Sequence, residues 1–149
     1  MAGGVFTLAD ITSADWSLAL DTPGFPGSGI GHVVQGLADV SQCIGIILTT
    51  PKGSDPLRPT FGADIWRYID NPINSAIPSI VRAVSEAITL WEPRVTLIGV
   101  TAQPAQDDGT QAIAHLAVNV TWQLKLSTSG STPSPLATSQ ITTVTVPPL

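Results

Sequence analysis

The run of sequence with the clearest chemical meaning is Glu92-Pro93-Arg94, in which opposite charges flank a proline. Proline fixes its own backbone angle φ, so the two charged side chains would stand on a rigid turn. A carboxylate and a guanidinium bind partner groups through charge-assisted hydrogen bonds. The pair either docks a partner or forms a local surface ion pair worth about 0–1 kcal/mol. From the residues alone, the local ion pair is favoured.

Carboxylates also occur at Asp64, Asp70, Glu86 and Glu92, and a glycosidase needs two of them at a fixed separation. No spacing marks any two as a pair. Arg94, close to Glu92, favours the ionised carboxylate, whereas a general acid must hold its proton. The sequence therefore predicts no catalytic residues and no enzyme activity.

A glycine-rich segment, residues 24–31, precedes a predicted helix, where a dinucleotide-binding loop would stand. Its glycines are spaced G-x-G-x-G and His32 follows, so the dinucleotide fingerprint is not met. His32 and His115 lack the spacing of metal ligands, and Cys43 borders an apolar helical stripe. The sequence predicts no metal site and no cofactor.

The composition limits the classes of partner. The chain has 149 residues, a net charge of −5 and only 11% charged residues, against a usual ~25%. Nucleic-acid binding through phosphate neutralisation is not expected at this charge. No leader and no apolar run of the ~20 residues that span a bilayer is evident, so we expect a soluble protein without a membrane partner. A surface so poor in charge is typical of proteins covered by partners in an assembly.

Hydrophobic periodicity predicts the helices. Apolar residues recur at steps of three and four over residues 33–48 and again over residues 73–91, where Pro78 either begins the helix or kinks it. Residues 61–69 are predicted to form a short helix.

Alternation of apolar and polar residues predicts the strands. They are expected near residues 16–20, over 94–101, over 112–126 and, after a Ser/Thr/Gly/Pro-rich linker, over 141–146. The last strand could fold back on its own sheet or add to the sheet of another subunit. We expect an α+β fold, a small antiparallel sheet with two to three helices on one face. Residues 1–126 are predicted to form one domain and residues 127–149 a linker with a β-prone tail.

Residues 33–100 resemble the baseplate wedge proteins of contractile phage tails, the group that includes tail sheath initiators and W-type baseplate proteins. The resemblance is carried by IGIILTTPKG at 44–53, by R-P-x-F-G-x-D-I at 58–65 and by W-E-P-R-V at 91–95, in the family's order. About half of the chain is covered, and several motifs agree in spacing.

The resemblance implies a structural protein whose fold is similar to the handshake domain of the sheath subunit. It implies a place in the tail baseplate of a virion assembled in the host cytoplasm, with six copies per baseplate. Glu92, Pro93 and Arg94 would then dock onto the core bundle of the wedge. The sheet would accept extended arms of the first sheath subunits, and we place the accepting edge at Val118 and Val120.

The same family also carries a lysozyme-like label. The alternative function is therefore a cell-wall hydrolase of the tail, in which Glu92 would act with Asp64 or Asp70.

Overall fold

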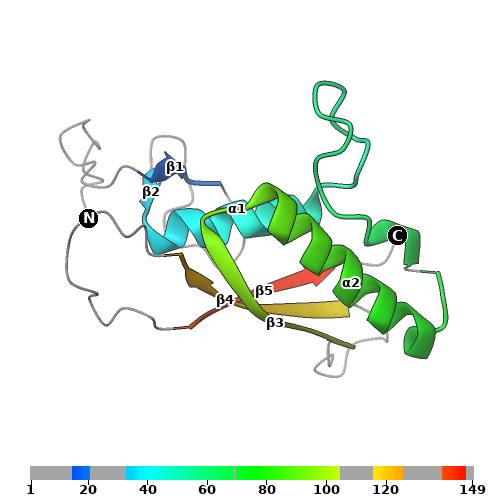
Figure 1. Ribbon diagram of the computed structural model, residues 1–149. Helices are drawn as coiled ribbons and strands as arrows, with labels where there is room; N and C mark the ends of the chain where they lie inside the picture. Colours follow the sequence, from blue (N-terminus) through cyan, green and yellow to red (C-terminus); the bar gives the residue numbers. More distant parts are fainter. Residues whose placement is uncertain (1–14, 21–32, 69, 105–115, 126–138, 147–149) are drawn as a thin grey trace, which may run out of the picture. The chain divides into compact units, whose positions relative to one another are not determined.

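The computed structural model describes residues 15–20, 33–68, 70–104, 116–125 and 139–146. The chain divides into two compact units, residues 1–43 and 44–149, and the division falls inside the first helix, α1 (Leu37–Thr49). Figure 1 shows the helices and strands with the labels used below.

The first unit contains a small two-stranded sheet and the start of α1. Strand β1 (Trp16–Leu18) pairs antiparallel with β2 (Val33–Gln35). Gly36 follows β2 with a φ of +60°, a conformation that glycine adopts at little steric cost. The chain can therefore turn directly from β2 into α1.

In the second unit, helix α2 (Ile73–Trp91) follows a one-turn 3-10 helix, η2 (Trp66–Tyr68). No side chain caps the start of α2; instead the Pro72 carbonyl accepts hydrogen bonds from the backbone N–H of Ser75 and of Ala76. At the other end, the backbone N–H of Glu92 donates to the carbonyl of Ile88 at 2.9 Å. Pro93 follows at once, and it cannot continue the helix.

A three-stranded antiparallel sheet completes the second unit, in the order β3 (Val95–Pro104), β4 (Leu116–Leu124) and β5 (Gln140–Val146). Helix α2 packs against β3 and lies along one face of this sheet (Figure 1). The register of β3 with β4 shifts between Leu97 and Gly99, whereas β4 and β5 pair without interruption.

The core of the second unit lies between α2 and the sheet. The stripe Ile80, Val84 and Ile88 of α2 is at most 2% exposed. On β4, alternate residues face the same side, and Val118, Val120 and Trp122 are at most 1% exposed. Inside this face, the Trp122 indole Nε1 donates a hydrogen bond to Thr142 Oγ1 of β5 at 2.9 Å.

The structure confirms the α+β class and most of the predicted elements, with two corrections. The helix expected from residue 33 begins at Leu37, because residues 33–35 pair with β1. The short helix expected over 61–69 is only the single turn η2; Gly62, with a φ of +97°, interrupts its start. For the helix over 73–91 the sequence left two alternatives open, and the structure decides between them: α2 begins at Ile73, so Pro78 lies inside it and does not start it.

The tail strand folds back on its own sheet, since β5 pairs with β4 along its whole length. Strand β5 therefore belongs to the same compact unit as residues 44–125, which is the first of the two alternatives that the sequence left open for the tail strand. The predicted strand residues 112–115 and the linker residues 127–138 lie outside the described residues.

Candidate functional site

The Glu92-Pro93-Arg94 corner joins the end of α2 to the start of β3. Here Arg94 donates from Nε to Glu92 Oε1 at 2.7 Å and from Nη2 to Glu92 Oε2 at 2.9 Å. Such a two-pronged arrangement matches the planar guanidinium to both carboxylate oxygens, so it fixes the orientation of Arg94 as well as its position.

The two charged groups differ in exposure. The Glu92 side chain is 4% exposed, while the Arg94 side chain is 33% exposed and Pro93 lies on the surface. Of the three corner residues, Pro93 and the guanidinium of Arg94 are therefore the accessible ones, and Glu92 lies buried behind them. Our expectation that Glu92 itself contacts a partner does not fit its burial.

Val118 and Val120 do not stand at an open edge. Strand β4 is the middle strand, with β3 on one side and β5 on the other, and both valine side chains are 0% exposed. Their backbone groups are used inside the sheet, so the accepting edge that we placed at these residues is wrong. Of the three strands, β3 and β5 form the edges.

A pocket of about 400 Å³ opens between α2 and the segment that precedes it. Leu90, Trp91 and Ala83 give it an apolar wall, and Lys52, Asp64, Arg82 and Glu86 add charges. The ring of Trp91 meets that of Phe61 edge to face, with 5.2 Å between centroids. The pocket thus adjoins the residue that precedes the corner.

The carboxylates of this pocket are paired with arginines. Asp64 lies 3.6 Å from Arg67, and Glu86 accepts a hydrogen bond from Arg82 at 2.7 Å. That hydrogen bond raises the pKa of Arg82 above its ordinary value. Of the four carboxylates that we considered, Asp64 and Glu86 line this pocket together, whereas Glu92 does not line it and Asp70 is exposed on another turn. The pocket therefore does not hold the pair that the hydrolase alternative names, Glu92 with Asp64 or Asp70.

Of the other residues singled out in the sequence, the structure describes only Cys43. Cys43 is half-buried, whereas His32, His115 and the glycine-rich segment lie outside the described residues. Among the residues that the structure describes, no group of three His, Cys, Asp or Glu side chains could hold a metal ion. None of the described helices is long and apolar enough to cross a membrane.

Sequence reasoning missed Gln42, which ties the first unit together. Its side-chain oxygen accepts from the Leu20 backbone N–H at 3.0 Å, and its amide nitrogen donates to Ser17 Oγ and to the Leu18 carbonyl. A glutamine inside a helical pattern carries no signal of such contacts.

Comparison with known proteins identifies the family. The family described as "Baseplate wedge protein gp25" matches residues 34–129. The chain belongs to this family. It is 40% identical over 78 residues to Baseplate protein W of Escherichia phage P2, a match that spans 52% of this chain and 68% of that protein. It is also 32% identical over 82 residues to Baseplate wedge protein gp25 of Enterobacteria phage T4, covering 48% of this chain and 62% of that protein.

Solved structures show the same fold. A Geobacter sulfurreducens protein labelled a putative tail lysozyme aligns with a TM-score of 0.59 and 27% identity, covering 74% of this chain and 89% of that one. A chain of the type VI secretion baseplate complex aligns with the same TM-score at 18% identity, covering 74% and 91%. The matched region of the family includes the corner, the pocket and β4.

Proposed function

We propose that this chain is a structural component of a contractile tail baseplate that joins the wedge to the first ring of the tail sheath. The observation that carries the proposal is the pair of parallel hydrogen bonds from Arg94 to Glu92, which we call the fork. It lies at an accessible corner of a chain that belongs to the baseplate wedge family. The proposed partners are the core-bundle proteins of the wedge and the sheath subunits. The protein would act in the virion tail, in six copies per baseplate, after assembly in the host cytoplasm.

In this proposal the corner is the contact with the wedge. Pro93 makes the turn rigid, and the buried Glu92 holds the Arg94 guanidinium in one orientation. A partner that meets this side chain loses little conformational freedom on binding, because Arg94 is already ordered. The partner surface would offer a carboxylate or backbone carbonyls to Arg94.

The outer edge of β5 is the better candidate for receiving an extended sheath arm. Residues 140–146 contain neither a charged residue nor a proline, and their pairing with β4 has no bulge. The other edge, β3, carries a register shift and ends in Pro104. Bulges and prolines disturb strand addition, whereas a regular uncharged edge favours it.

Lysine substitution tests which edge accepts the arm. A lysine on an exposed edge position hinders pairing with an added strand. In a producing cell that lacks its own copy, Ile141→Lys in β5 should give baseplates without extended sheath, and Thr101→Lys in β3 should give normal tails. The reverse pattern, or sheathed tails from both variants, would reject β5 as the acceptor.

The hydrolase alternative has a different signature. It needs a protonated acid opposite a second carboxylate, but Glu92 is bound by Arg94, and Asp64 and Glu86 are paired with arginines. Loss of cell-wall clearing in a Glu92→Gln variant that still assembles complete tails would favour the hydrolase over the structural role.

A further inference from the structure

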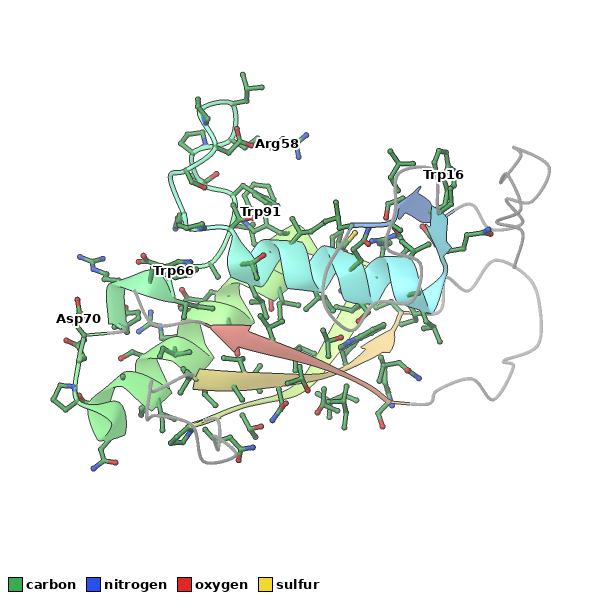
Figure 2. All side chains as sticks on the ribbon, turned by 180° about the vertical axis from the view of Figure 1, so that it is seen from behind. Trp16, Arg58, Trp66, Asp70 and Trp91 are labelled. Atoms are coloured by element: carbon green, nitrogen blue, oxygen red, sulfur yellow. The ribbon has the colours of Figure 1, made fainter. Side chains whose placement is uncertain are left out.

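A loop that neither the corner nor the sheet edges use stands out from the second unit. It comprises residues 51–60, and we call it the 51–60 loop. Figure 2 shows Arg58 on this loop, away from the helices, and Trp91 near its foot. All of its residues except Asp55 are exposed.

The foot of the loop is closed by tight backbone contacts. The backbone N–H of Ala63 donates to the Thr50 carbonyl at 3.1 Å, and Pro51 and Ala63 form an isolated parallel bridge. At Gly62, a Cβ atom would lie only 2.2 Å from the Thr50 carbonyl oxygen. The sequence thus places glycine where the two ends of the loop meet.

Turns also fix the course of the loop between its ends. Backbone hydrogen bonds run from Ser54 to Pro51, from Arg58 to Asp55 and from Phe61 to Arg58. In addition, Asp55 Oδ1 accepts from the Leu57 backbone N–H at 2.8 Å, which is an Asx turn. Prolines at 51, 56 and 59 restrict the chain further. The exposed loop is therefore ordered by its own contacts.

This ordered loop presents one apolar and two cationic side chains. Leu57 is 92% exposed, more than any other exposed large apolar residue that the structure describes. Lys52 and Arg58 are exposed too, and neither has an acidic partner among the described residues. The carboxylate of Asp55 is engaged by the turn. The loop is thus locally cationic in a chain whose net charge is −5.

We infer that the 51–60 loop is a docking knob for another protein of the baseplate. Leu57 inserts into an apolar socket, and Arg58 and Lys52 pair with carboxylates at its rim. The assignment follows from the charge and from the order of the loop, because a preformed loop gives up little entropy when it is bound. A single exposed leucine is common on protein surfaces and does not by itself indicate a binding site. Leu57 differs because a turn holds it in place and because the exposed Lys52 and Arg58 belong to the same loop. The inference rests on the proposed function, because the partner that would carry the apolar socket is taken to be another protein of the tail.

Competition for places in the particle tests the inference. A tagged variant is expressed together with untagged wild type, and mass spectrometry gives the ratio of the two chains in purified tails. Leu57→Ser should reduce the variant's share roughly 30-fold, the effect of removing an interface hot spot. Leu57→Met should keep its share. Leu18→Ser, which removes another exposed leucine, one that does not line the pocket beside α2, is the matched control.

Charge reversal at Arg58 tests the proposed ion pairs with carboxylates of the partner. Arg58→Glu should be excluded from particles, while Arg58→Lys and the control Arg67→Glu should be retained. Since these side chains are exposed, the thermal unfolding of the purified full chain should match that of wild type in every case. Equal shares for Leu57→Ser and Leu18→Ser, or for Arg58→Glu and Arg67→Glu, would overturn the inference.

A photo-crosslinking amino acid at position 57 identifies the socket directly. We expect one dominant crosslink, to a peptide of another tail protein with apolar residues and neighbouring Asp or Glu. A crosslink to a second copy of this chain, to a host protein or to nothing above the level of the same probe at Asp70 would reject the socket. If Leu57 variants are retained while Arg94 variants are excluded, the docking knob fails and the proposed function stands.

Discussion

Arg94 holds Glu92 through two parallel hydrogen bonds, of 2.7 and 2.9 Å, although only Pro93 separates them in the chain. Because the carboxylate is buried and the guanidinium is one-third exposed, this is more than a surface ion pair. The fork turns a flexible arginine into an oriented group at the end of α2. This relationship connects the local sequence to the proposed docking role.

Removal of the arginine should destabilise the fold. Arg94→Ala leaves a buried carboxylate without its donors, and we expect a loss of roughly 1–3 kcal/mol in the free energy of unfolding. Urea denaturation of the purified chain measures it. The matched control is Arg82→Ala, whose arginine forms an exposed pair with Glu86, and its midpoint should hardly change. Equal midpoints for the two variants would show that the fork contributes no stability.

Gly62 should tolerate no side chain. In Gly62→Ala, the new Cβ would collide with the Thr50 carbonyl, and the φ of +97° would strain an alanine. We expect a loss of roughly 1–3 kcal/mol, measured by thermal unfolding. Gly45→Ala is the control, because this glycine lies inside α1 with open space at its Cβ. It should be neutral or stabilise by up to about 1 kcal/mol, and a similar loss in both variants would contradict the argument.

The buried hydrogen bond between Trp122 and Thr142 should stabilise the pairing of β5 with β4. Thr142→Val leaves the buried indole N–H without its acceptor, and we expect a cost of roughly 1–3 kcal/mol. Thr143→Val removes an exposed hydrogen bond to Asn119 and should cost no more than about 0.5 kcal/mol. Denaturant titration of both variants compares the costs. If Thr142→Val costs no more than Thr143→Val, the buried bond does not stabilise the pairing.

The core stripe of α2 can be tested with a charge. Val84 is 0% exposed, so Val84→Asp would bury an unpaired carboxylate and should abolish cooperative unfolding. Leu90 is an exposed residue of the same helix, so the variant Leu90→Asp should remain folded. Circular dichroism with thermal melting separates the two. A cooperative melt of Val84→Asp would show that this stripe is not the core.

Local patterns predicted the elements where one physical signal dominates. The period of apolar residues predicted α2, because one stripe of the helix is buried, but it left the start open between Ile73 and Pro78. Alternation predicted β4 and β5, because alternate residues of these strands are buried. The start of α1 was wrong because Val33 and Val34 fit a helix and a strand equally well, and only pairing with β1 decides between them.

The site was predicted only in part, because burial and pairing depend on the fold. The sequence marked Glu92, Pro93 and Arg94, but it could not show that Glu92 is buried behind Arg94. Val118 and Val120 were correctly placed in a strand, yet the order of strands, which puts them in the middle, depends on where the tail folds. The contacts of Gln42 and the fixed conformation of the 51–60 loop depend on tertiary contacts and on turns. The periodicity of apolar residues carries no information about either.

Complementation shows whether the exposed corner is needed to build the baseplate. Cells that produce the tails but lack this gene would receive wild type, Arg94→Lys, Pro93→Glu or the control Arg82→Ala, and electron microscopy would count complete contractile tails. Pro93→Glu places a negative charge at the exposed corner and replaces neither residue of the fork. Arg94→Lys keeps the positive charge but loses the two parallel hydrogen bonds. We predict complete tails from wild type and Arg82→Ala, and bare tubes or missing baseplates from Pro93→Glu, with Arg94→Lys reduced. Complete tails from Pro93→Glu, or from cells without the gene, would contradict the account.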